Sequence, residues 1–330
     1  MIEIIKTLTE TYGPSGNEAR IRKVIKGFVG KLADEIKVDA LGNLIALRKG
    51  KGGGKKVMLA AHMDEIGIIV NHIDEKGFLR FSKVGGVSPR TLLGNRVEFE
   101  NGVIGVIGAE KMEDKEKTPP LDKLFIDVGA EDKEHCPVKI GDIGVFTRPL
   151  VVQGERLIAK AFDDRIGCAI LIQVMQELDE VPHDVYFVFT VQEEIGLRGA
   201  VTSTYGIAPQ VAVAIDVTRT GDTPEAPKMA VSLGKGPAIK VKDARMLSHP
   251  GVREALIKAA VQAGVPYQLE VLEGGTTDAA AMQLSREGIP AGVVSIPCRY
   301  VHTPSEMVDF NDVKNAVKLL KSFLTSPLDW

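Results

Sequence analysis

Four short and almost wholly apolar runs constrain what this chain can fold into. They show no alternation of polar and apolar residues, and they cover residues 57–61 (VMLAA), 185–191, 211–215 and 291–296. Such runs are typical of strands that are covered on both faces, as in a parallel sheet. Helical patterns accompany them at residues 166–178, 250–263, 278–287 and 311–324. This alternation predicts an α/β fold with a mostly parallel sheet and helices on both faces.

The segment from about residue 66 to residue 149 has a different character. Short β-rich runs are separated there by turns rich in glycine and asparagine, at residues 67–73, 78–82, 96–99 and 103–107. No convincing helix interrupts them, which is the pattern of a small all-β domain. A length of 330 residues also suggests about two domains. We therefore expect a discontinuous α/β domain, residues 1–65 and 157–330, with a β domain inserted at residues 66–156.

The composition argues against several kinds of partner. With 41 basic and 44 acidic residues, the net charge of −3 gives no field that would attract nucleic acid or an anionic membrane. No stretch approaches the roughly 18 apolar residues that cross a bilayer, and the first residues, MIEIIKTLTETYG, do not resemble a signal peptide. Cys136, Cys168 and Cys298 lie far apart and indicate reduced thiols. We expect a cytoplasmic protein that binds neither nucleic acid nor membranes.

Histidines and acidic residues follow each of the four apolar runs. They are His62, Asp64, Glu193, Glu194, Asp216 and His302. In open α/β sheets, ligands bind beyond the carboxyl ends of the strands. The side chains are therefore expected to converge on one edge of the sheet, although they are far apart in the sequence.

A further acidic pair, Asp163-Asp164, lies just before the predicted helix at residues 166–178. A carboxylate there can reach the same edge, where one bridging carboxylate can serve two metal ions. Mixed imidazole and carboxylate ligands suit zinc or cobalt, and manganese with less preference. Two metal ions can activate a water for attack on a carbonyl or phosphoryl centre. The sequence thus predicts a site for two divalent ions, with either Asp163 or Asp164 as the bridging ligand.

Two acidic residues beside the expected ligands suit other tasks. Asp64, two residues after His62, is placed to accept the second N–H of the imidazole and so to fix its tautomer. Adjacent residues at a strand end point in different directions. One member of the Glu193-Glu194 pair can therefore bind a metal ion while its neighbour takes a proton from the water.

Six strings of the sequence, in this order, resemble the tetrahedral aminopeptidases. These are glutamyl/leucyl-type enzymes with two co-catalytic metal ions, and some relatives have been labelled endoglucanases. The strings are AAHMDEIG (60–67), AFDDRIG (161–167), VQEEIGLRGA (191–200), AIDVT (214–218), GGTTDA (274–279) and SIPCRYVHTPSE (295–306). The resemblance covers essentially the whole chain. It implies a metal-dependent aminopeptidase that releases N-terminal residues from peptides.

The resemblance also implies which residues would bind the metal ions. His62 and His302 would each bind one ion. Asp163 would bridge both ions, and the peptide bond that follows it is often cis in such enzymes. Glu194 and Asp216 would complete the two sites.

The remaining implications concern catalysis and assembly. Glu193 would be the general base, and Asp64 would orient His62. Members of the family form dimers that combine into hollow dodecamers with the active sites facing an inner chamber. The inserted β domain would help to build that shell, so self-association is expected as well as the binding of peptides.

Other functions stay open at this point. A glycoside hydrolase usually needs two carboxyl groups about 5–9.5 Å apart and no metal, which would leave the histidines without a role. A shell or binding protein without activity would have no need of Glu193. A related deacylase or carboxypeptidase would need a cation for a free carboxylate, and several arginines are available: Arg165, Arg198, Arg219, Arg245 and Arg299. The preferred N-terminal residue depends on a pocket wall that we expect at residues 245–249 and 274–278.

Overall fold

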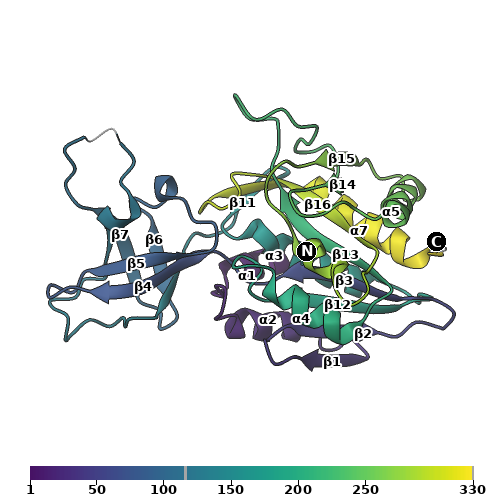
Figure 1. Cartoon of the computed structure of the whole chain (residues 1–330), viewed down its shortest axis with the longest axis horizontal. Coiled ribbons are helices and arrows are strands. Elements are labelled where there is room, and N and C mark those ends of the chain that lie inside the picture. Colours follow the sequence, from purple (N-terminus) through teal and green to yellow (C-terminus); the bar gives the residue numbers. More distant parts are fainter. Residues whose placement is uncertain (115–116, 329–330) are drawn as a thin grey trace.

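A large sheet and a separate β-barrel lie side by side along the longest axis of the protein (Figure 1). The computed structural model describes residues 1–114 and 117–328. The strands of the sheet are β1 (Glu35–Val38), β2 (Leu44–Arg48), β3 (Lys56–His62), β10 (Val151–Gln153), β11 (Arg156–Ala159), β12 (Asp184–Thr190), β13 (Val211–Thr218), β14 (Ala238–Lys242), β15 (Gln268–Val271), β16 (Ala291–Arg299) and β17 (Glu306–Asp309).

The barrel and the helices complete the described part of the chain. The barrel strands are β4 (Gly67–Ile73), β5 (Leu79–Val84), β6 (Arg96–Phe99), β7 (Ile104–Ala109), β8 (Leu124–Asp127) and β9 (Ile143–Phe146). The α-helices are α1 (Ile2–Glu10), α2 (Ala19–Val29), α3 (Phe162–Glu177), α4 (Arg198–Ile207), α5 (Pro250–Gln262), α6 (Asp278–Gln283) and α7 (Phe310–Thr325). Two short 3-10 helices are η1 (Pro89–Thr91) and η2 (Leu121–Lys123).

Parallel pairing runs through the centre of the sheet. The strand order is β1-β2-β12-β3-β13-β16-β17-β11-β10, and β14 and β15 join through β16. The pairs β12–β3, β3–β13 and β13–β16 are parallel, whereas the pairs nearer both ends of this order are antiparallel. The predicted α/β fold is confirmed. The carboxyl ends of the parallel strands meet at one edge, as the sequence argument required.

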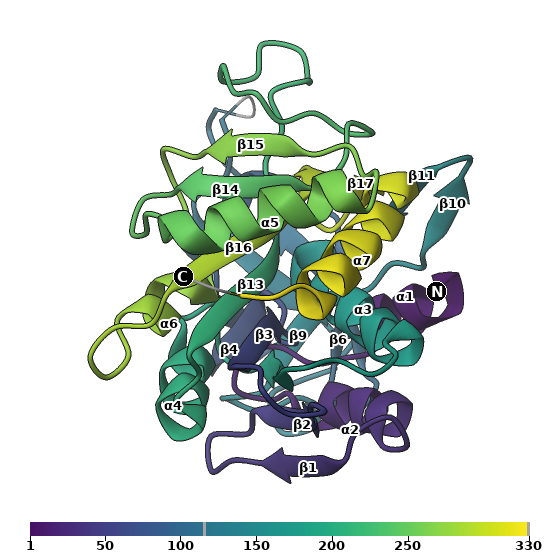
Figure 2. The same cartoon turned by 90° about the vertical axis from the view of Figure 1, so that its right-hand side faces the viewer.

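Alternate side chains of β3 enter two different hydrophobic cores. Val57 and Leu59 pack in a core that includes residues of α1, α2, α3, α5 and α7, whereas Met58 and Ala60 pack in a core with α4 and α6. Because successive residues of a strand point to opposite faces, the helices cover both faces of the sheet (Figure 2). This explains why the run at 57–61 carries no polar residue.

The barrel is closed and has a core of its own. Its strands follow the order β4-β5-β8-β7-β6-β9. The side chains of Leu79, Val97, Phe99 and Ile107 are buried in a cluster that is separate from both cores of the sheet. Closure leaves no barrel edge open for pairing. Four of its strands overlap the β-rich runs that the sequence predicted.

Some elements were not predicted, and packing explains one of them. The helix α4 has two glycines and several β-branched residues, which lower intrinsic helix propensity. Its Ala200 is fully buried against the core that includes α6, so tertiary contacts stabilise it. The three cysteines are unpaired, as expected. Among the described residues, no helix is long and apolar enough to cross a membrane.

Candidate metal centre

The side chains predicted to converge do lie together, at the carboxyl edge of the parallel strands. His62 ends β3, Asp216 lies near the end of β13, and Glu193-Glu194 follow β12. Asp163 comes from the first turn of α3, and His302 from the turn after β16. A cavity of about 310 Å³ is lined by all of these residues except His62. His62 is buried beside the cavity and contacts Asp163.

The Asp163 carboxylate lies between the two histidine rings. Its Oδ1 atom is 3.0 Å from Nε2 of His62, and its Oδ2 atom is 3.1 Å from Nε2 of His302. The peptide bond between Asp163 and Asp164 is cis, as the family resemblance implied. A carboxylate with one oxygen toward each imidazole is arranged as a bridging ligand would be.

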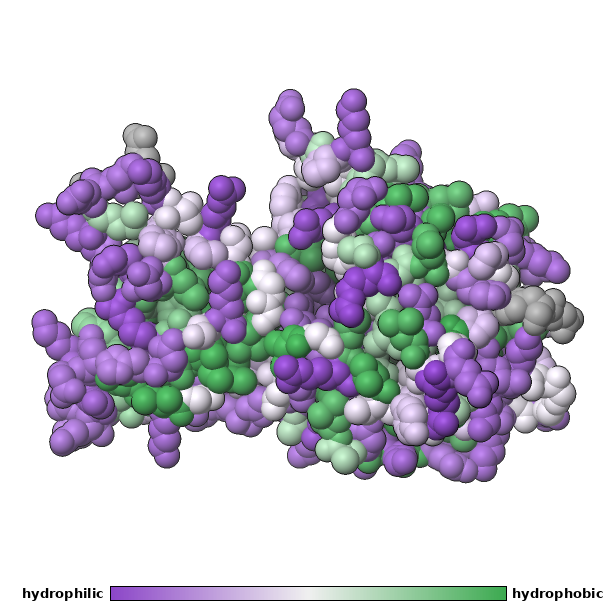
Figure 3. All heavy atoms as spheres, viewed as in Figure 1, coloured by the Kyte–Doolittle hydropathy of each residue, from purple (hydrophilic) through white to green (hydrophobic). Residues whose placement is uncertain are grey.

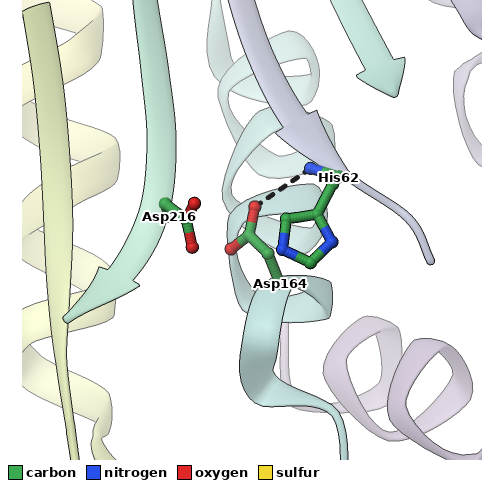
Figure 4. Close-up of side chains that lie close together, drawn as sticks. All are labelled: His62, Asp164 and Asp216. Atoms are coloured by element: carbon green, nitrogen blue, oxygen red, sulfur yellow. Dashed lines mark hydrogen bonds between the residues drawn. The ribbon is translucent and has the colours of Figure 1, made fainter. Parts of the chain in front are cut away.

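The neighbouring Asp164 uses its oxygens differently. Its Oδ2 atom accepts a hydrogen bond from the backbone N–H of His62 at 3.2 Å (Figure 4), and its Oδ1 atom accepts one from Gly167 at 3.0 Å. Its oxygens nevertheless lie close to Asp216 and to the His62 ring, within 4.8 Å when one ligand atom is taken from each residue. The two backbone bonds favour a structural role for Asp164 and leave Asp163 as the better candidate for the bridge.

Glu194 and Asp216 complete the group of possible ligands. Glu194 Oε1 lies 3.3 Å from Nε2 of His302, is buried, and has no hydrogen-bond partner. Asp216 forms a group with His62 and Asp164, and in Figure 4 the Asp164 carboxylate lies between the Asp216 carboxylate and the His62 ring. Two groups of possible ligand atoms thus share His62: one with Asp164 and Asp216, and one with Asp163 and Glu194.

Asp64 connects the His62 ring to the Glu193-Glu194 pair. Nδ1 of His62 lies 3.1 Å from the Asp64 carbonyl oxygen and 3.5 Å from its carboxylate. The same carboxylate accepts bonds from the backbone N–H groups of Glu193 and Glu194, at 3.0 and 3.2 Å, and from the Ser15 hydroxyl at 2.6 Å. Asp64 thus holds His62 with Nε2 toward Asp163, and it also fixes the backbone of the acidic pair.

The carboxylates of the site form ion pairs with histidines and not with lysine or arginine, among the described residues. Burial raises the pKa of Glu193, Glu194 and Asp216 above the usual range of a carboxyl group, and neighbouring carboxylates raise it further. Burial lowers the pKa of His302, but its contacts with Asp163 and Glu194 outweigh this and raise the pKa to about 11. Within the described residues, no ion pair joins Asp163, Glu193, Glu194 or Asp216 to a lysine or arginine.

A divalent cation fits this donor set. Buried charges are normally paired or bind metals, and the site offers two imidazoles, four carboxylates and one orphaned carboxylate oxygen on Glu194. Mixed nitrogen and oxygen ligands suit zinc and cobalt, and manganese to a lesser degree. The residues present therefore fit the metal ions that the sequence predicted.

The cavity wall comes from three parts of the chain. Gly274, Gly275, Thr276 and Arg245 line it, in the two segments that the sequence predicted. Beside this wall, α6 is capped by Thr277, whose hydroxyl oxygen accepts a hydrogen bond from Ala279 N–H. The loop after barrel strand β5 supplies the opposite wall. A Cβ atom at Gly86 would collide with the His302 ring, so this close approach requires glycine.

Several residues around the site were not identified from the sequence. Ser15 donates to Asp64, and Glu306 accepts bonds from the backbone of Asp163 and His302. The Ser15–Asp64 and Glu306–Asp163 contacts join segments that are far apart in the chain, so no local pattern could reveal them. The position of Glu306 at the end of the SIPCRYVHTPSE string, four residues after His302, was the available signal.

Comparison with known proteins identifies the family of this chain. Residues 42–319 match the M42 glutamyl aminopeptidase family. The lysyl aminopeptidase of Pyrococcus furiosus is 39% identical over an alignment of 345 positions that covers 99% of this chain and 98% of that one. An aminopeptidase from the archaeon Desulfurococcus kamchatkensis has the same fold, with a TM-score of 0.95 and 44% identity over 98% of this chain and 94% of that chain.

A second structure bears on assembly. The TET1 peptidase of Pyrococcus horikoshii, which can assemble into a tetrahedron or a large octahedral shell, has a TM-score of 0.88 and 36% identity over 98% of this chain and 99% of that chain. Family match, relatives and structures agree along almost the full length. The chain belongs to the M42 glutamyl aminopeptidase family and is a metal-dependent aminopeptidase, a hydrolase of peptide bonds.

Proposed function

We propose that two divalent metal ions, zinc or cobalt and less favourably manganese, are held by His62, Asp163, Glu194, Asp216 and His302. The observation that carries this proposal is the Asp163 carboxylate, whose two oxygens face the two imidazoles at 3.0 and 3.1 Å. In this arrangement Asp163 would bridge the ions, and Glu194 and Asp216 would complete the two sites.

Glu193 is the general base of this proposal. Its Oε2 atom is 4.0 Å from Nε2 of His62, and its side chain lines the cavity. When bound, the two metal ions supply Lewis-acid activation of the attacking water and of the scissile carbonyl. Glu193 accepts the proton of that water and passes it to the leaving amine. Asp64 keeps His62 and the Glu193 backbone in place through the bonds described above.

The proposal extends to the organisation of the chain and to assembly. We assign residues 1–65 and 157–330 to the catalytic domain and residues 66–156 to an inserted β domain that takes part in self-association, through dimers to a dodecamer. Large apolar side chains on the barrel and its loops support this assignment, because Leu93, Ile104, Val106 and Ile140 are exposed. Hydrophobic spheres gather along one side of the barrel in Figure 3.

A deacylase or carboxypeptidase is the second candidate. Arg219 and Arg245 line the cavity and offer cations to the free carboxylate that such a substrate carries. A glycoside hydrolase is less well supported, since that chemistry has no use for the two imidazoles beside Asp163. These alternatives differ in which substrate is cleaved and in whether cleavage needs metal.

The test is release of the N-terminal residue from a panel of aminoacyl-p-nitroanilides. The assay is run on protein as purified, after chelation, and after zinc or cobalt is restored. We expect cleavage that the chelator abolishes and the metal restores, and the panel also reports the preferred side chain. If metal-loaded protein cleaves none of these substrates but hydrolyses N-acylated amino acids or peptides with a free C-terminal carboxylate, the protein is a deacylase or carboxypeptidase instead.

A further inference from the structure

One buried carboxylate beside the metal centre, that of Glu306, bonds to the backbone of two proposed metal ligands. Glu306 is the first residue of β17 and is 1% exposed. Its Oε2 atom accepts the backbone N–H of Asp163 at 3.0 Å, and its Oε1 atom accepts the backbone N–H of His302 at 2.8 Å. A single side chain thus joins the backbones of two of the proposed ligands.

The two N–H groups lie in irregular backbone. Asp163 has non-helical dihedral angles inside the first turn of α3, with φ −78° and ψ 101°. His302 lies in a turn with a left-handed φ of 64°, a conformation uncommon for residues other than glycine. Backbone in such conformations persists where surrounding contacts fix it. The two oxygens of Glu306 provide one such contact to each residue.

Glu306 itself is held by strand pairing on both sides. On one side β17 pairs with β11, where Glu306 lies opposite Ala159. Two residues later, Ala161 has a left-handed φ and the chain turns into α3, which carries Asp163. On the other side β17 pairs with β16, where Met307 lies opposite Arg299, three residues before His302. The carboxylate is therefore attached to a frame that is fixed with respect to both ligands.

We propose that Glu306 is a positioning residue that sets the spacing of Asp163 and His302 and thereby the affinity and geometry of the metal site. The inference rests on the ligand roles proposed above. It predicts that metal binding depends on a carboxylate that bonds only to the backbone of the ligands. Partners of metal ligands typically affect metal affinity by 10–100-fold when they are changed.

Two substitutions of Glu306 test separately whether two acceptor oxygens are needed and whether the length of the side chain matters. Glu306→Gln keeps one carbonyl oxygen, but its amide group is a donor and would face the other backbone N–H. Glu306→Asp keeps two acceptor oxygens on a side chain that is shorter by one methylene, so it cannot reach both N–H groups from the same strand position. Both variants should disturb the spacing, each for a different reason.

The matched control is Val308→Ala on the same strand. Val308 is fully buried in the core of the sheet and has strand partners in both β11 and β16. This variant should lower thermal stability through a cavity, without changing any bond to Asp163 or His302. It therefore reports what loosening β17 alone does to the metal site.

The experiment is titration of the metal-free full-length protein with Co²⁺, followed by its visible absorption bands and by the number of ions bound. Thermal unfolding of each metal-free variant is measured in parallel. We expect Glu306→Gln and Glu306→Asp to bind at least one ion about 10-fold more weakly and with altered bands. Val308→Ala should keep the wild-type affinity and spectrum despite a lower Tm.

Wild-type affinity and spectrum in Glu306→Gln would overturn the inference, and so would equal weakening in Val308→Ala. If Glu306→Gln does not fold, Glu306→Asp decides the question by the same criteria. The variant His302→Ala shows whether the Glu306 inference or the proposed ligand set is at fault. If His302→Ala still binds the full number of ions, the ligand assignment is wrong, whatever Glu306 does.

Discussion

Two groups of mostly buried charged side chains lie next to each other in this molecule, and only one of them contains lysine and arginine. The first is the metal-facing cluster of His62, Asp163, Glu194, Asp216 and His302. The second is the Glu65 triad, formed by Glu65, Lys160 and Arg165. Glu65 lies three residues after His62, while Lys160 and Arg165 flank Asp163, so the same two segments contribute to both groups.

The Glu65 triad satisfies its own charges. Glu65 Oε2 lies 2.5 Å from Nζ of Lys160, and Oε1 lies 3.2 Å from Nη2 of Arg165. Arg165 also donates to the backbone carbonyls of Leu8, Thr11 and Gly13. In the metal-facing cluster, within the described part of the chain, the ion pairs of the carboxylates are with histidines only, and Glu194 Oε1 makes no hydrogen bond. The contrast is consistent with the proposal that added cations occupy the first cluster, whereas the triad supports the fold.

The largest expected effect is on stability and comes from the triad. Glu65→Gln removes the only carboxylate that contacts Lys160 and Arg165 in the described ion pairs, and leaves two buried cations facing each other. Breaking a buried pair in this way costs about 3–5 kcal/mol. Chemical denaturation of the metal-free protein should show this loss in the free energy of unfolding.

The control for this prediction is Lys160→Met. It leaves Glu65 paired with Arg165, so the remaining charges cancel, and its cost should be clearly smaller than that of Glu65→Gln. Equal costs for the two variants would mean that packing, and not charge balance, stabilises the triad. In that case the comparison with the metal-facing cluster would lose its basis.

The next effect is on turnover and comes from the cavity. Glu193→Gln keeps the shape of the side chain but removes its ability to accept a proton, so we expect kcat to fall by at least about 10²-fold. The number of bound metal ions and the Tm should stay close to those of the wild type. Steady-state assays with the best nitroanilide substrate, together with metal analysis, measure both quantities.

Glu180→Gln is the matched control, because the Glu180 side chain is 72% exposed and lies far from the cavity lining. It should leave kcat unchanged. Turnover close to that of the wild type in Glu193→Gln would remove Glu193 as the general base. A parallel loss of metal would instead identify it as a ligand.

The two groups also differ in how far the sequence revealed them. The metal-facing residues follow apolar strands, so period and topology were enough to predict that His62, Asp216 and His302 meet at one edge. The assignment of Asp163 over Asp164 came from family resemblance, and the hydrogen bonds of Asp164 now support it.

The Glu65 triad and the Glu306 contacts could not be predicted in this way. Lys160 and Arg165 look like ordinary surface charges in the sequence, and only long-range packing buries them. The helix α4 was missed for a similar reason, because its local propensity is low and its stability comes from contacts with the core. Sequence periodicity thus predicts the position of charged side chains at the ends of strands, but not of side chains that long-range packing brings together.

The smallest effect concerns Glu18, a buried carboxylate that is neither paired with a lysine or arginine of the described chain nor proposed as a metal ligand. Glu18 is 4% exposed, and its Oε1 atom accepts backbone N–H groups from Gly16 and Gln192, but no ion pair with a lysine or arginine is found for it among the described residues. Burial raises the pKa of Glu18 to about 6 from a usual 4.5. The folded protein therefore holds this proton more tightly than the unfolded chain does.

The sign of the pH dependence follows from that difference. The contribution of Glu18 to stability is fully present below about pH 4.5 and is lost as the pH rises through about 6. The amide oxygen of Glu18→Gln can accept the same N–H groups without a charge. We expect the variant to be more stable than the wild type by about 1–2 kcal/mol at pH 8 and nearly equal at pH 4.

Guanidinium denaturation of the metal-free proteins at the two pH values measures this gap, with the exposed Glu3→Gln as a control for the change in net charge. A gap that is the same at both pH values would mean that Glu18 does not titrate between them. A wild type that is the more stable protein at pH 8 would show that its two backbone hydrogen bonds compensate the buried charge. Glu18 would then belong with the balanced Glu65 triad, and a buried carboxylate near this site would not by itself indicate a missing cation.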